Sequence, residues 1–154
     1  MKKISAGMVI AVISIVLTIV ATVLYNANVT TAGYFQNATV TNLMTLSIAA
    51  IATLAVAIVL SVAVKGNKVV DIVVGLLQIA TPAILAVCAL WLVAGRAEGL
   101  GYIYFSNADV ALEVGTAENL ASASTAVKSI ALYGASMLVA VIGAFFSIRP
   151  AAKK

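Results

Sequence analysis

Four long apolar runs separated by polar segments constrain this chain more than any other feature. They cover residues 4–24, 43–64, 69–94 and 129–148, and the only charged residue inside them is Asp71, near the start of the third run. An α-helix rises 1.5 Å per residue, so about 20 apolar residues cross the roughly 30 Å hydrocarbon core of a bilayer. Each run is therefore long enough to form a transmembrane helix.

The composition requires an apolar environment for most of this chain. Hydrophobic residues make up 64% of the 154 positions and charged residues only 9%, whereas soluble domains average about 45–50% and about 25%. A small domain buries only part of its surface in its own interior, so a lipid bilayer is the expected partner of the apolar runs. We predict an all-α membrane protein in which residues 1–154 form a single four-helix transmembrane domain.

The first run has a second interpretation. Lys2 and Lys3 precede it and Thr30-Thr31-Ala32 follows as a weak cleavage site, as in a secretory signal peptide. The apolar part of a signal peptide is normally about 7–15 residues long, and residues 4–24 exceed that length. We therefore expect a retained helix.

The Lys and Arg residues predict the orientation, because cytoplasmic loops of membrane proteins carry an excess of them. With a cytoplasmic N-terminus, seven basic residues and one acid lie inside, for a net charge of +6, and the other side carries −2. We expect a multi-pass protein of the plasma or inner membrane, with both termini and the inner turn 65–68 cytoplasmic and the loops 25–42 and 95–128 outside. The inner charges are Lys2, Lys3, Lys65, Lys68, Asp71, Arg149, Lys153 and Lys154; the outer charges are Arg96, Glu98, Asp109, Glu113, Glu118 and Lys128. The basic excess is a topology signal and a candidate contact for anionic lipid, not a nucleic-acid footprint.

Both outer loops contain strand-favouring residues. Residues 25–41 are rich in Thr, Val and aromatic residues, and residues 102–105 read Tyr-Ile-Tyr-Phe. Pairing of these two pieces would give a small extracytoplasmic cap.

The second outer loop also contains helix signals. Ser106 is a candidate N-cap for a short helix over residues 107–114, with Gly115 at its end. Thr116 is a candidate N-cap for a second helix. This helix is expected to be long, because no proline occurs before Pro150. We expect the fourth transmembrane helix to run from about residue 117 to 148, so that it extends outward beyond the bilayer.

Several kinds of chemistry lack the residues that they need. The sequence has no histidine and a single cysteine, Cys88, which lies in an apolar run and is expected to act as a small core residue. No zinc, haem or thiol-redox site can be recognised, nor a glycine-rich phosphate loop or a Ser-His-Asp set. Asp109, Glu113 and Glu118 lack the alternate-residue spacing of a calcium loop. We expect no enzyme activity, cofactor or metal.

Polar residues inside the runs have two interpretations, helix packing or the lining of a pore. Gln78, Thr81 and Pro82 form the most polar cluster, and Pro82 leaves the carbonyl of Gln78 without its helical partner. Small residues recur at a spacing of four, which places them on one helix face where backbones can approach closely. The series are Ser14, Thr18 and Thr22 in the first run, Ala49, Thr53, Ala57 and Ser61 in the second, and Ser136, Ala140 and Ala144 in the fourth.

The candidate outer contacts are mainly aromatic: Tyr34, Phe35, Tyr102, Tyr104, Phe105 and Lys128. We expect a non-enzymatic tetraspan that works through self-assembly or assembly with other membrane subunits. The alternative is a channel or transporter-like subunit whose oligomer encloses a pathway lined by Ser, Thr and Gln78.

Overall fold

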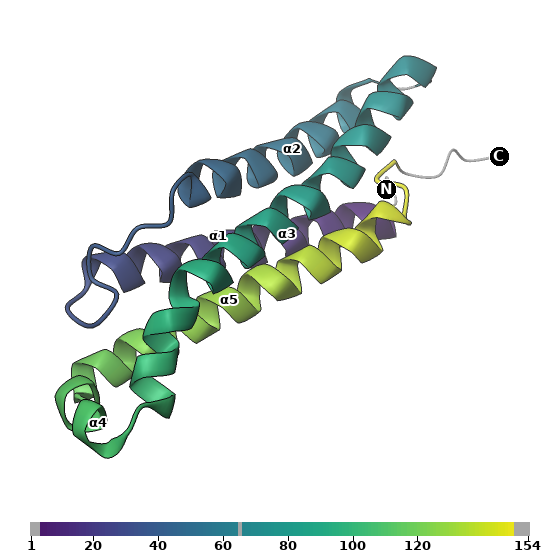
Figure 1. The fold of residues 1–154 in the computed structure, drawn as a ribbon. Coiled ribbons are helices and arrows are strands. Elements are labelled where there is room, and N and C mark those ends of the chain that lie inside the picture. The colour runs from purple at the N-terminus through teal and green to yellow at the C-terminus, as the bar shows by residue number, and fades with distance from the viewer. Residues whose placement is uncertain (1–3, 65, 150–154) are drawn as a thin grey trace.

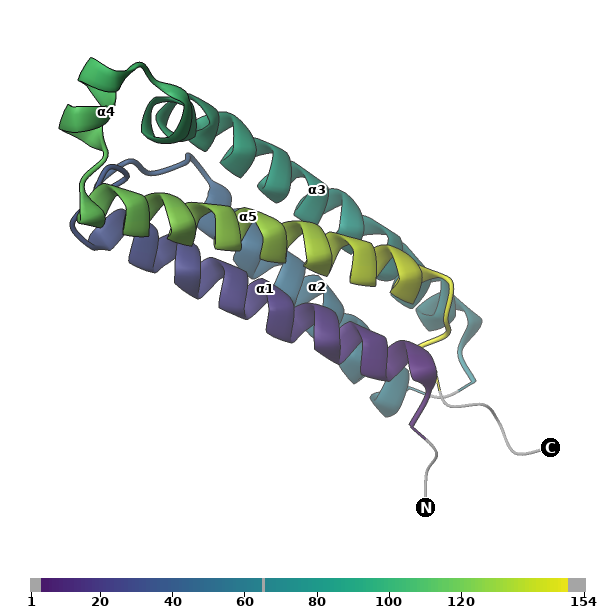
Figure 2. The same cartoon turned by 90° about the horizontal axis from the view of Figure 1, so that it is seen from below.

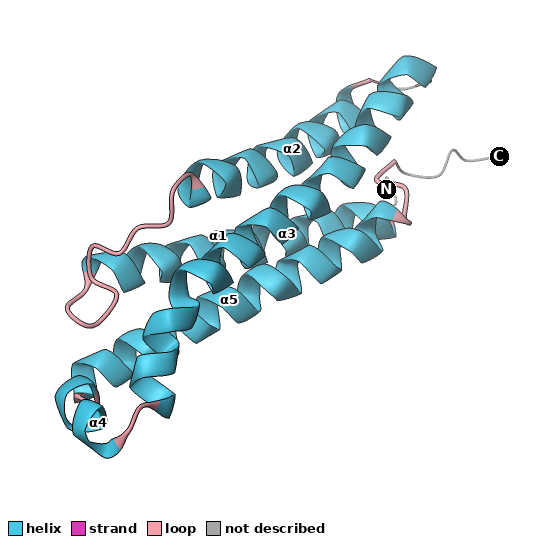
Figure 3. Ribbon diagram, viewed as in Figure 1, coloured by secondary structure: helices cyan, strands magenta, loops and turns pink. Residues whose placement is uncertain are grey.

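The computed structural model describes residues 4–64 and 66–149, and every regular element within them is helical (Figure 3). The helices are α1 (Ala6–Thr30), α2 (Leu43–Ala63), α3 (Lys68–Phe105), α4 (Ala108–Val114) and α5 (Ala117–Ala144). The long helices α1, α2, α3 and α5 lie side by side as a bundle, and the short α4 lies at one end of it, beside the end of α3 (Figure 1).

The four long helices pack as a ring of neighbours. The most extensive contact joins α1 and α5, followed by those of α3 with α2 and with α5, and a smaller contact between α1 and α2 closes the ring (Figure 2). The chain thus enters and leaves the bundle on adjacent helices. At that end the Ser5 hydroxyl donates to the Ile148 carbonyl, and we call it the terminal end; the opposite end is the α4 end.

An ion pair adds a second link at the terminal end. Arg149 Nε lies 2.6 Å from Asp71 Oδ1, and Arg149 Nη2 donates to the Val64 carbonyl at 2.9 Å. These contacts connect the segment after α5 to the turn between α2 and α3.

The four long helices are each long and apolar enough to cross a membrane. Large apolar side chains remain exposed along them, among others Val16, Val23, Val59, Leu76 and Leu138. Such a surface is compatible with an integral membrane protein whose helices contact lipid.

Two helices are longer than a bilayer requires. With 38 residues α3 is roughly 57 Å long, and with 28 residues α5 is roughly 42 Å long. Their excess lies at the α4 end, where α3, α4 and α5 form a projection (Figure 1). α5 begins at Ala117, as predicted, and α3 continues beyond its apolar run to Phe105.

The predicted strand cap is wrong for the described residues, which contain no strand. Residues 25–30 continue α1, because Tyr25, Asn28 and Val29 are buried at helical spacing against the bundle. Residues 102–105 end α3, where Ile103 alone of the four is buried. Burial on one helix face has overridden the strand propensity of these side chains.

The predicted helix starts differ in accuracy. Thr116 caps α5 as expected, since its hydroxyl accepts from the Asn119 amide at 3.2 Å. The short helix is capped by Asn107, not by Ser106. At its other end α5 stops at Ala144, four residues before the expected boundary, and its last turn tightens as the Phe146 amide donates to the Gly143 carbonyl.

Candidate functional site

Hydroxyl groups of α1 and α5 bond one another in the bundle interior. Ser136 Oγ lies 3.1 Å from Ser14 Oγ and 2.7 Å from Thr18 Oγ1, and Ser136 Oγ also donates to the Ser14 carbonyl at 2.9 Å. All three residues are buried. The small side chains let the two helices approach closely, as their spacing predicted.

A second hydroxyl cluster centres on Tyr133 of α5. Its hydroxyl lies 2.6 Å from Ser47 Oγ of α2 and 3.1 Å from Thr22 Oγ1 of α1. The ring is fully buried and packs in the same cluster as Cys88, which is buried as expected. One phenol thus joins three helices.

The remaining small polar residues of α2 also have partners within the chain. Thr53 Oγ1 lies 3.0 Å from Thr81 Oγ1 of α3, and Ser61 donates to the Ala57 carbonyl of its own helix. The Thr81 hydroxyl donates to the Leu77 carbonyl, and α3 continues through Pro82. These contacts satisfy the hydroxyl groups between α2 and α3.

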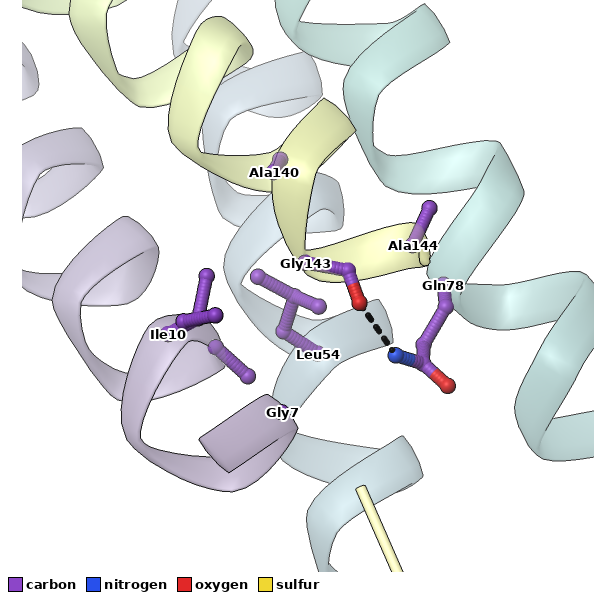
Figure 4. A pocket seen from close by; sticks show the side chains of 8 residues that line it. Gly7, Ile10, Leu54, Gln78, Ala140, Gly143 and Ala144 are labelled. Carbon is purple, nitrogen blue, oxygen red and sulfur yellow. Dashed lines mark hydrogen bonds between the residues drawn. The ribbon is translucent and has the colours of Figure 1, made fainter. Parts of the chain in front are cut away.

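Gln78 joins α3 to the end of α5. Its side-chain nitrogen donates to the Gly143 carbonyl at 3.1 Å and to the Phe146 carbonyl at 3.0 Å, the first of which is drawn in Figure 4. The Gly143 carbonyl also accepts from the Phe146 amide, so Gln78 adds a second donor to the end of α5 and supplies one to the Phe146 carbonyl beyond it. The cavity beside it, lined also by Gly7 and Leu54, has a volume of about 10 Å³, which is room for about one water molecule.

The α4 end contains a buried cation, Arg96 of α3. Its guanidinium carbon lies 4.6 Å from the ring centroid of Phe35 and 5.8 Å from that of Tyr25. Only 1% of this residue is exposed, its Nη1 donates to the Gly95 carbonyl, and Nε and Nη2 have no partner among the described residues. Stacking on aromatic rings is a favourable environment for a guanidinium that has lost its water.

The loop between α1 and α2 is fastened to this end. Phe35 is 3% exposed, its amide donates to Ser122 Oγ at 3.3 Å, and the Val40 amide donates to the Tyr25 hydroxyl at 2.7 Å. A Cβ on Gly99 would lie 2.5 Å from the Tyr34 ring, so only glycine leaves room there. Phe35, predicted as an outer contact, is therefore a buried anchor, because its ring covers Arg96.

The other predicted contact residues are exposed at the α4 end. Phe105 is 87% exposed, Tyr102 and Tyr104 are each 47% exposed, and Tyr34 and Lys128 are also on the surface. A hollow of about 400 Å³ lies beside them, lined by Glu98, Gly101, Tyr102, Phe105, Ser106, Asn107 and Val110.

Three residues that make these contacts were not predicted from the sequence: Arg96, Asn28 and Tyr133. Arg96 was placed in an outer loop, although its spacing from the buried Leu92, Gly99 and Ile103 matches one helix face. Asn28 is buried and donates to the Ser122 carbonyl at 2.8 Å, and Tyr133 lies in an apolar run where its hydroxyl gave no separate signal.

The described residues bring no metal-binding set together. Within residues 4–64 and 66–149 no three His, Cys, Asp or Glu residues lie close enough to hold a metal ion. Comparisons of this chain with protein-family models, with curated proteins and with solved structures find no match. The geometry of the chain itself therefore carries any functional conclusion.

Proposed function

We propose that this protein is a non-enzymatic membrane tetraspan that acts through assembly, with the α4 end as its contact surface. One observation carries the proposal: a large apolar side chain, Phe105, is 87% exposed beyond the part of α3 that a bilayer can cover. Trp91 favours the lipid–water interface, and Phe105 lies 14 residues further along the helix, or roughly 21 Å.

The neighbouring surface extends this apolar character. Leu112 of α4 is 85% exposed, and Tyr102 and Tyr104 of α3 are half exposed. Contiguous exposed apolar patches outside lipid mark protein–protein contact sites, and Tyr and Phe are enriched in them. A partner that covers these side chains would remove them from water.

The hydrogen bonds in the interior of the bundle favour a role in assembly over a transport pathway through a single chain. Five of the Ser and Thr residues that are candidates for a pore bond one another between helices: Ser14, Thr18, Thr53, Thr81 and Ser136. Ser61 donates within its own helix, and Gln78 donates to carbonyls at the end of α5. A pathway through one chain would need these groups to face open space. A pathway between subunits, the alternative prediction, would have to use other residues.

Orientation is part of the proposal. The exposed acids Glu98, Asp109, Glu113 and Glu118 lie toward the α4 end, and Arg149 lies at the terminal end. Because cytoplasmic sides carry an excess of Lys and Arg, the charges of the sequence direct the α4 end outward from a plasma or inner membrane. The contact surface would then meet partners outside the cytoplasm.

Native mass spectrometry of the full chain in lipid nanodiscs tests the proposal. We expect a homo-oligomer, and we expect the double variant Tyr102→Ser/Phe105→Ser to shift it toward the 15.7 kDa monomer. Tyr34→Ser, on the same end but outside the Phe105 surface, is the control and should associate like the wild type. A wild-type chain that is monomeric and captures no other membrane subunit would contradict assembly.

Flux through reconstituted liposomes tests the alternative. We expect no conductance above that of empty vesicles, and Gln78→Leu or Thr81→Val should leave this unchanged. Ion or solute flux that either substitution alters would favour the channel.

A further inference from the structure

The hollow at the α4 end lies on the face of α3 that points away from the bundle. Glu98, Gly101, Tyr102 and Phe105 are spaced i, i+3, i+4 and i+7, which puts them on one side of the helix. A Cβ added to Gly101 would meet no atom within 4 Å, so this glycine leaves the floor of the hollow open.

The lining of the hollow has the chemistry of a cation site. Glu98 is its only charged residue, and two aromatic rings, Tyr102 and Phe105, stand beside it. A carboxylate attracts a basic group directly, and the faces of aromatic rings attract it through their quadrupole. A Lys or Arg side chain would satisfy both.

The exposed charged residues toward the α4 end indicate which Lys or Arg side chain could enter the hollow. Glu98, Asp109, Glu113 and Glu118 are exposed, and Lys128, in the first half of α5, is the exposed basic residue of residues 95–128. Among the described residues, the ion pair within 4 Å joins Asp71 and Arg149 at the terminal end. Glu98 and Lys128 therefore have no oppositely charged side chain within that distance in residues 4–64 and 66–149. Each copy therefore offers one basic group and one acidic hollow.

The two groups lie at compatible depths in a shared bilayer. Ser129, next to Lys128, donates to the Ala21 carbonyl at 2.9 Å, whereas Arg96 lies beside Tyr25, one helical turn further toward the α4 end. Glu98 is about 3 Å beyond Arg96, so the backbones at positions 98 and 128 differ in depth by roughly 7–9 Å.

The directions of the side chains close that difference. Side chains lean toward the N-terminus of their helix, which is the α4 end for α5 and the terminal end for α3. Lys128 therefore leans toward the α4 end and Glu98 leans back toward the bilayer. Copies inserted with the same orientation bring these two groups to one level.

From this geometry we infer that the hollow binds Lys128 of a neighbouring copy, in an ion pair with Glu98 flanked by Tyr102 and Phe105. The inference rests on the assembly proposed above and names its contact. The two halves of the contact lie on different helices. Two copies related by a two-fold axis would each fill the other's hollow and form a closed dimer, whereas copies that bind head to tail would form a ring or a filament.

A charge swap in the full-length protein tests the pair. Native mass spectrometry in nanodiscs, or a dilution series in detergent, compares the wild type with Lys128→Glu, Glu98→Lys and the double variant. We expect each single reversal to weaken association at least about fivefold, since an exposed pair contributes up to about 1 kcal/mol and repulsion adds to its loss. The double variant should return to within about twofold of the wild type.

A steric test uses two glycines of the same helix. Neither glycine has an atom within 4 Å of an added Cβ, so both substitutions fit the single chain. Leucine at position 101 would fill the hollow, whereas leucine at position 75 would enter open space on the apolar part of α3. We expect Gly101→Leu to weaken association and Gly75→Leu to leave it unchanged.

The outcomes separate this contact from assembly itself. If the wild type is an oligomer that neither the single charge reversals nor Gly101→Leu weaken, the Lys128 contact is wrong but assembly still holds. The same conclusion follows if the single reversals weaken association and the double variant does not restore it. A monomeric wild type would overturn both.

Discussion

At the scale of single residues, buried polar groups hold this apolar bundle in one arrangement. In lipid, apolar side chains pack on each other and on acyl chains with little preference, so interhelical hydrogen bonds and close contacts help to select the partner of each helix. Tyr133 does this for α1, α2 and α5, because its hydroxyl meets Thr22 and Ser47. Arg96 does it for the first loop, because its guanidinium stacks on Phe35.

Removing the Tyr133 hydroxyl isolates its contribution. We expect Tyr133→Phe to lower the free energy of unfolding by about 0.5–1.5 kcal/mol, since the ring still fills its place while two hydrogen bonds are lost. Reversible unfolding in mixed detergent micelles measures the change. Tyr104→Phe is the matched control, because Tyr104 is half exposed and should show no loss; equal stability of both variants would contradict the bridging role.

At the scale of helices and loops, the starts of α2 and α5 could be predicted from the sequence, whereas the α4-side ends of α1 and α3 could not. Runs free of charge indicate a span by length alone, so α2 was predicted to within one residue at its C-terminal end. Beyond the bilayer, position 96 reads as a charged loop residue and residues 102–105 as a strand. Both are helical because packing against the first loop buries Arg96 and Ile103, a tertiary effect that local propensity does not contain.

The contact between Gly99 and the first loop gives a test at this scale. A methyl group at position 99 would lie within 3 Å of the Tyr34 and Phe35 rings, so we expect Gly99→Ala to push the loop off α3. Amide hydrogen exchange across residues 31–42 should rise about tenfold or more, as local opening becomes easier. Gly101→Ala, two residues along and with open space, should leave exchange unchanged; a similar rise in both would point to a general effect on α3.

The Asp71–Arg149 pair predicts a small, salt-dependent link between elements. Arg149 is partly buried and Asp71 about half exposed, and such pairs contribute up to about 1 kcal/mol. We expect Asp71→Asn to lower the melting temperature in low salt and the difference to shrink at 0.5 M NaCl, where exposed charges are screened. A salt-independent loss would assign the effect to the first turn of α3, which Asp71 also occupies.

At the scale of the whole molecule, the distribution of charge and the lengths of the helices combine into one arrangement. The helical class and the number of long helices follow from the four apolar runs. The contact of Ser5 with Ile148 agrees with them, because an even number of antiparallel helices returns the chain to the end where it started. The candidate contact surface could be predicted only in part: Tyr102, Tyr104 and Phe105 were indicated by their aromatic character, whereas the hollow depends on how α4 folds back beside α3. That return is set by the break at residues 106–107, where the sequence indicates a helix cap but not the direction in which α4 leaves α3.

Single cysteines read both the orientation and the depth of this arrangement. The native Cys88 is fully buried and should not react, so a new cysteine reports alone. With the α4 end outside, Leu112→Cys should react with a membrane-impermeant maleimide on intact cells, and Val69→Cys, at the start of α3, only after permeabilisation. Val59→Cys, exposed on α2 in the expected hydrocarbon region, should react in neither case because thiolate needs water. Labelling of position 69 but not of position 112 on intact cells would reverse the predicted orientation. Labelling of position 59 would show that water reaches the outer surface of α2, and this result would contradict the assignment of α2 to the bilayer.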